Sequence, residues 1–569
     1  MYKKLSLRTN LTYMKKIYFL ICILISCFSQ GQKKPKAIKI TYSKSFNGTL
    51  IENQDQILVY SDEQKTIIST AKILSKKTTF PFEQSYIERK NNSYIQSAQL
   101  SSSKNIVTID SLALEKQTFE FLNDTKIILG YKCKKAKTII NSNTIELWYT
   151  DELNLKGAPT ILGQNLGLVL ELNRNNNFLI AATKVEKLKA IPKTISLPDT
   201  KSKLDLLTYK DLLWKSKFIT LEIFKNEIIN FSEASKSNDS ILRFANGTVI
   251  LKKVKFPEIK SGSQVFIDLT EQSNGDAYDR TGSVFAIPVN EKYSFLDGLK
   301  NGAKMLPIYE NGNGKQYQGV AKTENYSPLL ELMRFFTPFG IKQYDHLQLK
   351  DKTWHQSVPY RQDISELQAA LSNQEVYIGT FIGNYDKGGH KISLNITIHD
   401  EEKQDLKNTF LLPLFNTTNV MEMAGQEYAT MFNNDKGIEV RFTLEKDLKN
   451  VRLRYITTGH GGWENGDEFV PKKNTILLDG KEAFSFVPWR MDCGSYRLFN
   501  PASGNFENGL SSSDYSRSNW CPGTVTNPNL IDLGDLKAGK HTIQVKIPQG
   551  KDEGTYFNSW NVSGVLIGE

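Results

Sequence analysis

Short segments in which apolar and polar residues alternate recur along most of this chain. Residues 451–456 (VRLRYI) and 542–547 (TIQVKI) show the alternation most cleanly. β-strands produce this pattern because successive side chains point to opposite faces of a sheet. At 569 residues the chain is too long for one core and should contain about three or four domains. The sequence therefore predicts an all-β protein with several domains.

Changes in composition suggest where these domains begin and end. They predict an upstream extension with a signal peptide (1–31), a β-rich accessory domain (32–190), a partly helical linker (191–238), a first jelly-roll domain (239–400) and a second jelly-roll domain (401–569). The linker contains apolar residues at helical spacing, up to Ile223 and Phe224, which predicts one or two amphipathic helices. Two consecutive all-β domains of this size are typical of jelly-roll sandwiches. The Gly-, Asn- and Lys-rich residues 300–327 are expected to form a long surface loop.

The N-terminus carries an export signal. Lys15 and Lys16 precede an apolar stretch, residues 17–25, which is too short to span a bilayer as a stable helix. Ordinary signal cleavage near residues 29–31 is one interpretation. A lipid anchor at Cys27, which has lipobox spacing, is the other. Either way the mature chain is expected to be exported, as a secreted or periplasmic protein or as an outer-membrane lipoprotein. No later stretch is apolar enough to be a transmembrane helix.

Three cysteines follow the predicted signal peptide. Cys493 and Cys521 enclose a loop rich in Ser, Asn and Gly, which predicts a disulfide in an exported protein. Closing this loop should contribute roughly 3–4 kcal/mol. Cys133 is predicted to be a buried free thiol rather than a nucleophile.

Charge and motifs exclude several classes of function. The net charge is +11, but the Lys and Arg residues are dispersed and no nucleic-acid-binding motif is present, so no nucleic-acid partner is expected. The chain also lacks an HExxH motif, a GxSxG elbow and a Gly-rich phosphate loop. No metal or cofactor is expected, and carboxylates are the main candidates for catalysis.

Two carboxylates occur in the same local arrangement. Asp279 lies in GDAYDR, just before the apolar residues 283–287, and Glu468 lies in GDEF, just before the strand 474–478. Each follows a glycine and acidic residues, and each has an aromatic neighbour. Because they belong to different predicted domains, they can face each other only across a domain interface, where ligand sites often lie. A carboxylate that activates water contributes roughly 10²–10⁴-fold to a rate.

One histidine is a further candidate. His460 stands in TGHGGW, and it is the only one of the six His in a Gly-rich loop that could expose its ring to a substrate. It could equally be a residue that packs inside the loop. Both interpretations stay open from the sequence.

The N-terminal region resembles a family of exported bacterial proteins, the GLPGLI family. The similarity rests on residues 130–136 (GYKCKKA), 147–152 (LWYTDE) and 164–172 (QNLGLVLEL), in which QNL stands in place of the namesake GLP. The family implies a β-rich domain without known chemistry. An accessory role is therefore expected.

The second half, residues 240–569, resembles the bacterial peptide:N-glycosidase F family. The matching motifs are DAYDR at 276–280, RFFTP at 334–338, Glu468 with its following strand, and the segment from Arg517 to the WCPG that ends at Gly523. The resemblance implies two jelly rolls with the active site between them. It also implies hydrolysis of the amide that joins an asparagine side chain to the first GlcNAc of an N-glycan. N-glycoproteins are then the substrates, and a monomer is expected.

The resemblance also implies roles for individual residues. Asp279 would be the principal catalytic carboxylate, which aligns or activates water, and Glu468 would bind and polarise the sugar. Arg280 and Arg517 would orient carboxylates and substrate, as a guanidinium does well. A structural ion pair is the alternative for each arginine. Trp520 and His460 are expected to contact the substrate.

The chain departs from the family pattern in three respects. Two small disulfides beside the Asp279 and Glu468 loops have no cysteines here, so packing is expected to hold the Glu468 loop. Gly379 stands where the family has a third carboxylate near the glycan core. This change predicts space beside the first GlcNAc and tolerance of a core α1,3-fucose. The extra N-terminal domain is similar to that of a second subgroup of the family.

Two other functions remain open. A jelly roll can serve as a non-catalytic glycan-binding protein, because fold alone does not determine function. A glycosidase would use two carboxylates to cut between sugars. The combination of Asp279, Glu468 and Arg517 favours the amidase over a lectin, which has no need of this set.

Overall fold

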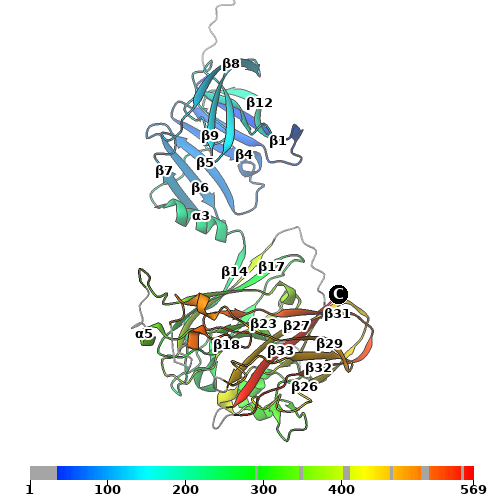
Figure 1. Cartoon of the computed structure of the whole chain (residues 1–569). Coiled ribbons are helices and arrows are strands. Elements are labelled where there is room, and N and C mark those ends of the chain that lie inside the picture. The colour runs from blue at the N-terminus through cyan, green and yellow to red at the C-terminus, as the bar shows by residue number, and fades with distance from the viewer. Residues whose placement is uncertain are drawn as a thin grey trace, which may run out of the picture. The chain divides into compact units, whose positions relative to one another are not determined.

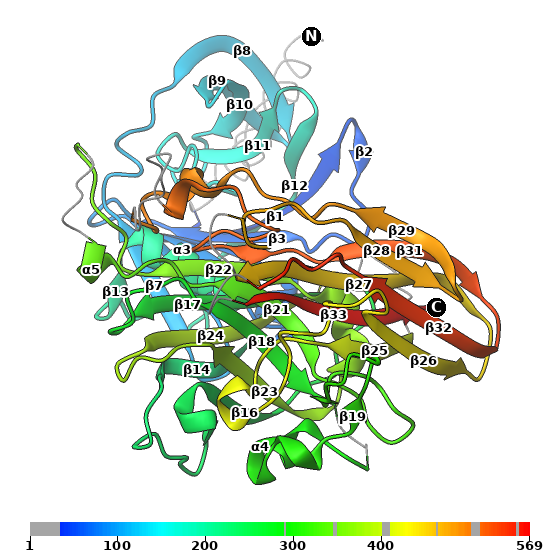
Figure 2. The same cartoon turned by 60° about the horizontal axis from the view of Figure 1, so that its bottom comes forward.

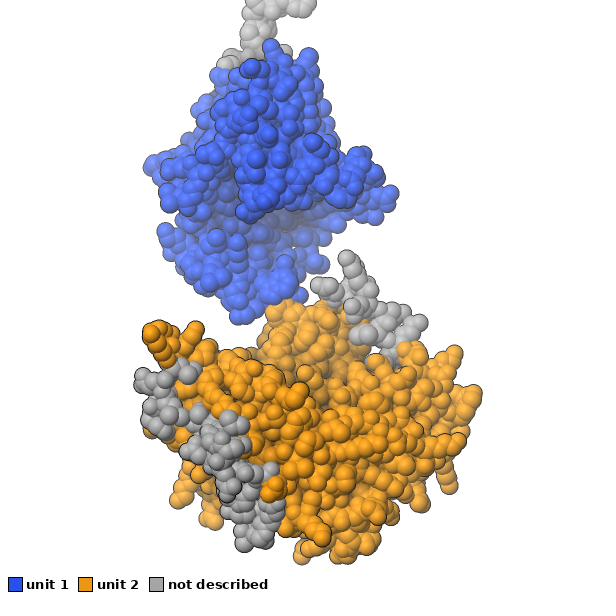
Figure 3. Space-filling view, in the orientation of Figure 1, with its two compact units in different colours: residues 1–217 blue, residues 218–569 orange. Residues whose placement is uncertain are grey.

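The computed structural model describes residues 35–288, 292–344, 350–400, 410–461, 465–501, 512–552 and 557–569. The chain forms two compact units, Met1–Lys217 and Phe218–Glu569 (Figure 3). The predicted signal peptide and Cys27 lie outside the described residues. Within the described ranges, no helix is long and apolar enough to cross a membrane.

The first unit is built on a single large sheet (Figure 1). Its central strand β1 (Ala37–Phe46) pairs antiparallel with β12 (Phe178–Leu188) on one side and β3 (Ile57–Asp62) on the other. The sheet order is β13-β7-β6-β5-β4-β3-β1-β12-β11-β10-β9-β8, with β2 paired to β1. The prediction of a β-rich N-terminal domain is confirmed.

The bounds of the remaining elements in this unit complete its description: β2 (Thr49–Leu50), β4 (Lys65–Thr70), α2 (Ala71–Leu74), β5 (Phe82–Glu88), β6 (Ser93–Gln99), β7 (Asn105–Asp110), β8 (Glu120–Ile128), β9 (Tyr131–Ile140), β10 (Asn143–Thr150), β11 (Leu168–Arg174), β13 (Lys203–Leu204) and α3 (Leu206–Lys215). Cys133 on β9 is free and buried, as predicted. Burial raises the pKa of its thiol to about 11, which disfavours the reactive thiolate.

The predicted linker is only partly helical. Helix α3 begins after Asp205, whose carboxylate accepts a 3.0 Å hydrogen bond from the Thr208 backbone N–H. The expectation of a further helix around Ile223 and Phe224 is wrong, because Ile219–Ile229 forms strand β14 and pairs with β24 (His390–His399). A register shift next to Phe224 lets two consecutive apolar residues be buried, which imitates helical spacing in the sequence.

The second unit contains two β-sandwiches (Figures 1 and 2). The sheets of the first are β14-β24-β17-β22 and β15-β16-β23-β18-β21-β30. Their strands are β15 (Leu242–Phe244), β16 (Val249–Lys255), β17 (Gln264–Ser273), β18 (Thr281–Ile287), β21 (Leu330–Phe336), β22 (Val358–Asp363), β23 (Glu375–Ile382) and β30 (Val525–Thr526). β30 follows Arg517 in the sequence, yet it pairs with β21. The C-terminal part of the chain therefore completes a sheet of the first sandwich.

The second sandwich combines the sheets β25-β33-β27-β31 and β26-β32-β28-β29. Its strands are β25 (Phe410–Asn416), β26 (Ile438–Leu444), β27 (Leu448–Gly461), β28 (Asn474–Leu478), β29 (Lys481–Phe486), β31 (Asn529–Leu536), β32 (Gly539–Lys546) and β33 (Asn558–Gly568). The two alternating segments in the sequence lie on β27 and β32. The prediction of two consecutive jelly rolls is confirmed.

Strand β33 joins the cores of the two jelly rolls. All its residues are buried. Val565 and Ile567 pack in the core of the first jelly roll, whereas Val562 and Leu566 pack in that of the second. Since alternate side chains of a strand point to opposite faces, β33 is covered by one sandwich on each side. The two jelly rolls are thus held together by a continuous apolar contact.

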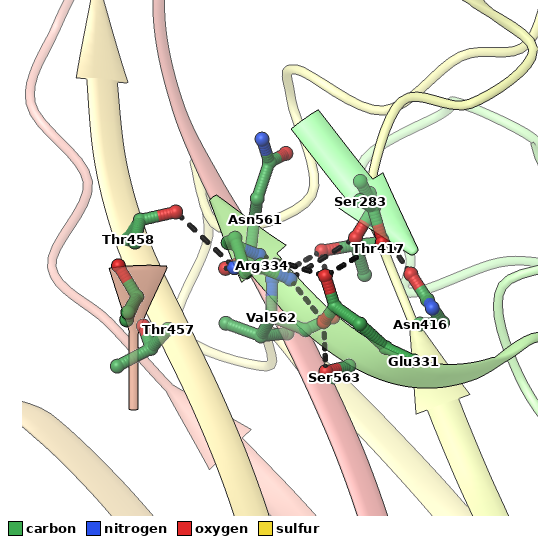
Figure 4. Close-up of polar contacts among 12 residues, drawn as sticks. Ser283, Glu331, Arg334, Asn416, Thr417, Thr457, Thr458, Asn561, Val562 and Ser563 are labelled. Atoms are coloured by element: carbon green, nitrogen blue, oxygen red, sulfur yellow. Dashed lines mark hydrogen bonds and ion pairs between the residues drawn. The ribbon is translucent and has the colours of Figure 1, made fainter. Parts of the chain in front are cut away.

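A buried ion pair crosses this interface (Figure 4). Arg334 Nη2 lies 2.7 Å from Glu331 Oε2, and both side chains are fully buried on β21. Residues three apart on a regular strand face opposite sides, but a register shift at Leu332 brings these two to the same face. Arg334 Nη1 donates to Thr458 Oγ1 at 3.1 Å and to the Asn561 carbonyl at 2.5 Å. One guanidinium therefore connects β21 with β27 and β33.

A second arginine crosses in the opposite direction. Arg454 on β27 donates to the carbonyl oxygens of Glu331 at 2.9 Å and Leu332 at 3.0 Å. Its Nε also lies 2.7 Å from Glu366 Oε1. The bulge on β21 is thus held by a side chain of the other jelly roll.

Residues 300–327 form the expected surface loop only in part, since exposed turns alternate with buried residues. Tyr317 and Val320 are completely buried in the core of the second jelly roll. Asn311 Nδ2 donates to the carbonyl oxygen of Met431 at 2.7 Å. The polar composition of this segment suggested exposure to solvent. Its asparagine side chains instead bind backbone groups of the second jelly roll. The elements of this connection are α4 (Phe295–Asn301), β19 (Ile308–Tyr309) and β20 (Tyr317–Gln318).

Replacing Arg334 should destabilise the second unit strongly. Arg334→Met leaves the Glu331 carboxylate buried without its cation, and breaking such a pair costs about 3–5 kcal/mol. The free energy of unfolding of the second unit, measured in urea, should fall by this amount. Arg441→Met is the matched control, because Arg441 is 84% exposed in its pair with Glu439 and should contribute less than about 1 kcal/mol. Equal losses for the two variants would contradict the prediction.

Candidate active site

The three groups singled out in the sequence meet at one end of the interface between the jelly rolls. Asp279 precedes β18 in the first jelly roll, Glu468 follows β27 in the second, and Arg517 precedes β30. Arg517 Nη1 lies 3.2 Å from Asp279 Oδ2 and also contacts Glu468 Oε1. The side chains of Asp279 and Glu468 are 15% and 18% exposed. A single guanidinium nitrogen therefore joins one carboxylate from each jelly roll.

Several contacts hold Arg517 in this position. Its Nη2 donates to the carbonyl oxygen of Ser512 at 2.7 Å and to the Ser512 hydroxyl at 2.9 Å. Its guanidinium also lies over the ring of Trp520, 4.3 Å from the ring centroid. The backbone of Arg517 pairs with that of Arg490 through hydrogen bonds of 2.8 and 3.0 Å. The predicted disulfide, Cys493–Cys521, is present and closes the segment that carries Arg517.

Burial determines the charge state of the two carboxyls. It raises the pKa of Asp279, although the nearby Arg517 and Arg280 partly oppose the shift. It raises the pKa of Glu468 to about 7, with Arg517 opposing the shift and Asp279 adding to it. Two carboxyls that share one cation titrate together. The pair can therefore hold one proton near neutral pH and offer both a base and an acid.

Asp276, which was not predicted as a functional residue, braces the Asp279 loop. Its carboxylate accepts hydrogen bonds from Arg280 Nε at 2.7 Å, from Arg280 Nη2 at 3.1 Å and from the Tyr278 backbone N–H at 3.1 Å. Burial alone would raise the pKa of Asp276, but hydrogen bonds from His390 and Arg280 hold it well below its usual value. Arg280 forms the structural ion pair that was one of its two interpretations, and its contact with substrate stays a prediction. In the sequence, the signal for Asp276 is its position as the first residue of the DAYDR motif.

A second buried aspartate braces the Glu468 loop. Asp467 Oδ2 accepts a 2.8 Å hydrogen bond from Trp560 Nε1, and both carboxylate oxygens lie 3.0 Å from the Gly550 backbone N–H. The Ser518 hydroxyl donates to the carbonyl of Asp467 at 2.6 Å, and the Ser518 N–H donates to the carbonyl of Glu468 at 2.9 Å. The expectation that packing holds this loop is incomplete, because buried hydrogen bonds also hold it where no disulfide is present.

His460 and Trp520 form an aromatic cluster beside Arg517. Trp520 stacks on Phe336 with ring centroids 4.3 Å apart, and the His460 ring lies 5.4 Å from that of Trp520. Burial, then Arg334 and Arg517, lower the pKa of His460 to about 3, so the ring is neutral. His460 is half-buried, and Trp520 is only 4% exposed. Contact of either residue with substrate stays a prediction, and Trp463 of the same motif lies outside the described residues.

Gly379 does not belong to the site. It lies on β23, and a Cβ at this position would come within 2.5 Å of the Phe285 ring and 2.4 Å of Leu251 Cδ2. Both residues are fully buried in a core cluster of the first jelly roll. Phe285 is six residues beyond Asp279, about 20 Å along an extended strand. The glycine makes room for an aromatic ring in the core and opens no space near the carboxylates, so its assignment as a substrate-binding residue is wrong.

Comparison with known proteins identifies the family. Three family models match the chain: N-glycanase peptide, N-terminal domain, over residues 40–211; Peptide-N-glycosidase F, N terminal, over 220–398; and Peptide-N-glycosidase F, C terminal, over 427–567. Two solved structures of PNGF-II, in space groups C2 and P21, are each 59% identical, with a TM-score of 0.86. The matches cover 94% of this chain and 98% and 99% of those chains. The chain belongs to the peptide-N-glycosidase F family.

Other comparisons are more distant. A solved PNGase F, described as a glycosylasparaginase from Flavobacterium meningosepticum, is 13% identical, covers 62% of this chain and 96% of its own, and has a TM-score of 0.40. No curated protein matches the chain significantly. The region that resembles the GLPGLI family is matched by the N-glycanase N-terminal domain model. This match agrees with the predicted subgroup that carries an extra N-terminal domain.

The raised pKa of Glu468 should appear as a pH-dependent stability in this peptide-N-glycosidase F family member. Between its unfolded value of 4.5 and about 7, the folded state binds more protons than the unfolded state. The wild type should therefore lose up to about 3 kcal/mol over this range relative to Glu468→Gln, which does not titrate. Thermal unfolding of both proteins from pH 4 to 8 measures this difference. A difference that stays constant with pH would contradict the shift.

Proposed function

We propose that this protein hydrolyses the amide bond between an asparagine side chain and the first GlcNAc of an N-glycan. As a member of the peptide-N-glycosidase F family, the chain is a peptide:N-glycosidase enzyme, and its substrates are N-glycoproteins and glycopeptides. The observation that carries the proposal is the shared contact of Asp279 and Glu468 with Arg517. It supplies a base, an acid and a fixed cation around one point.

In the proposed reaction, Asp279 activates water. Its buried Oδ2 has an ion pair with Arg517 at 3.2 Å but no hydrogen-bond donor of good geometry among the described residues. The Asp279 side chain is 15% exposed, and the accessible part of its carboxylate can accept the proton of a water molecule that attacks the amide carbon. The carbon–nitrogen bond then breaks, and the nitrogen leaves with a proton. Asn becomes Asp, and the glycan departs as a glycosylamine.

Glu468 serves the sugar side of the bond. Because its pKa is raised to about 7, it is partly protonated at neutral pH and can donate a hydrogen bond or a proton there. Arg517 keeps both carboxyls in place and stabilises negative charge that develops on the amide oxygen. The step uses protein groups and water, and no cofactor is proposed.

Two competing functions make different predictions about products. A glycan-binding protein would leave the glycopeptide unchanged. A glycosidase would cut between sugars and leave GlcNAc on asparagine, and two carboxylates this close to one nitrogen are also compatible with that chemistry. The identity of the products therefore decides the function.

Mass spectrometry in ¹⁸O-labelled water tests the proposal. An N-glycopeptide should return as a peptide with Asp that carries one heavy oxygen. Asp279→Asn should lower kcat about 10²–10⁴-fold, because the general base is lost. Asp268→Asn is the matched control: this aspartate pairs with Arg361 and is 34% exposed on β17, and its loss should leave kcat unchanged.

The alternatives correspond to other outcomes of the same experiment. A glycopeptide that is bound but unchanged would support a binding protein. A single GlcNAc left on asparagine would show glycosidase chemistry. An Asp279→Asn variant with normal kcat would remove Asp279 from the mechanism.

Tolerance of a core α1,3-fucose remains a prediction without support from Gly379. Gly383 lies nearer to the Asp279 loop than Gly379 does in the sheet, since its N–H donates to the carbonyl of Thr281 at the start of β18 at 3.0 Å. If the fucose is tolerated, kcat/KM for a core α1,3-fucosylated glycopeptide should lie within about tenfold of that for its unfucosylated twin, a gap of 1.4 kcal/mol. If the enzyme cleaves the unfucosylated glycopeptide but not the fucosylated one, this prediction is wrong.

We also propose that the protein is exported and acts as a monomer. The Cys493–Cys521 disulfide supports export, because disulfides persist in oxidising compartments. Whether the N-terminus is lipidated at Cys27 can be tested by mass spectrometry of the mature protein.

A further inference from the structure

A histidine is buried behind the Asp279 loop, between two carboxylates. His390 is the first residue of β24 and lies opposite Ser273, the last residue of β17. Its Nδ1 is 2.8 Å from Glu271 Oε1, and its Nε2 is 3.4 Å from Asp276 Oδ2. The side chains of His390 and Glu271 are fully buried, and that of Asp276 is 2% exposed. None of the catalytic steps above uses this cluster.

The charges in this cluster balance only when His390 is protonated. Two buried carboxylates are stable side by side only with a cation between them. Burial would lower the pKa of His390, but hydrogen bonds to Asp276 and Glu271 raise it to about 9. Each ring nitrogen of the imidazolium then donates to one carboxylate. Among the described residues, other charged or titratable groups near the cluster are Arg280 and Asp279, beyond Asp276, and Tyr360 on β22, beside Glu271.

The cluster is connected to the catalytic carboxylate through Asp276. The Asp276 carboxylate binds the Tyr278 backbone N–H and the Arg280 side chain, and these two residues flank Asp279 in the sequence. The Arg280 backbone N–H is also held by Thr337 Oγ1 at 2.8 Å. Residues 278 and 280, on either side of Asp279, are thus both bonded to Asp276, and Arg280 is also bonded to Thr337. These shared contacts fix the backbone around Asp279. We call the ion pairs of Asp276 with Arg280 and His390 the ionic brace. They hold the Asp279 loop, which contains no cysteines.

We propose that His390 is a positioning residue for the hydrolysis, which holds Asp276 between Glu271 and Arg280 and thereby keeps Asp279 facing Arg517 and Glu468. The catalytic part of this inference rests on the proposed function, whereas the positioning of the loop does not. His390 acts through Asp276 and touches no reacting atom.

Kinetics of single and double variants test the path from His390 to Asp279. His390→Gln should lower kcat about 10–100-fold with little change in KM, because a displaced catalytic group costs about that much. Asp276→Asn should have a similar effect, and the double variant should be no worse than Asp276→Asn alone, as expected for residues in one network. His399→Gln is the matched control at the other end of β24, and it should retain wild-type kcat. Additive losses in the double variant would overturn the proposal.

The pH profile separates positioning from a merely structural role. The pKa of His390 is raised from 6.5 to about 9, so the brace is fully present below pH 6.5 and is lost as pH rises through 9. The kcat of the wild type should fall first as Glu468 loses its proton near pH 7 and a second time as pH rises through 9. Glu271→Gln removes one carboxylate and should shift this second fall to lower pH in a folded protein. A second fall at the same pH in Glu271→Gln would overturn the proposal.

Hydrogen exchange provides a readout that is independent of activity. The Tyr278 and Arg280 amides should exchange faster in His390→Gln than in the wild type or His399→Gln, while the Val562 amide on β33 stays protected and reports an intact fold. Unchanged exchange at both amides would overturn the proposal. If exchange rises as expected but the wild type cleaves no glycopeptide, the positioning of the loop stands and the proposed function fails.

Discussion

The buried ion pair between Arg334 and Glu331 determines how the two jelly rolls meet. It lies on β21 of the first jelly roll, and its guanidinium also binds Thr458 and the Asn561 carbonyl in the second. Charges this deep are tolerated only when every donor and acceptor is used. The geometry of the interface is therefore narrowly specified. Because Asp279 and Glu468 come from opposite sides of this interface, their separation depends on it.

Within the site, two buried aspartates fix the loops that carry Asp279 and Glu468. Each candidate catalytic carboxylate lies on a loop next to a buried aspartate, Asp276 for Asp279 and Asp467 for Glu468, that binds backbone N–H groups. These aspartates hold the loops in place without cysteines. The candidate carboxyls Asp279 and Glu468 themselves have few partners apart from Arg517. Their raised pKa values follow from that arrangement, since burial is only partly offset by one shared cation.

Sequence patterns predicted the strands well wherever one face of a sheet is buried, as in β27 and β32. They also led to Asp279, Glu468, Arg517 and the disulfide, through motifs and loop composition. They failed where a residue's environment is made by distant segments. Ile223 and Phe224 look helical because a bulge buries both. Tyr317 is buried although the residues around it in the sequence are polar. A glycine stands at position 379 because the ring of Phe285 leaves no room for a side chain.

The sequence by itself determined the fold class, the family resemblance and the residue types at the site, because these depend on local alternation and short motifs. Only the tertiary structure decided which charged side chains form ion pairs with one another. Arg280 turned out to bind Asp276, and His390, 114 residues away in the chain, binds the same carboxylate. Electrostatic partners are chosen by burial and distance in space, and neither quantity can be read from spacing along the chain.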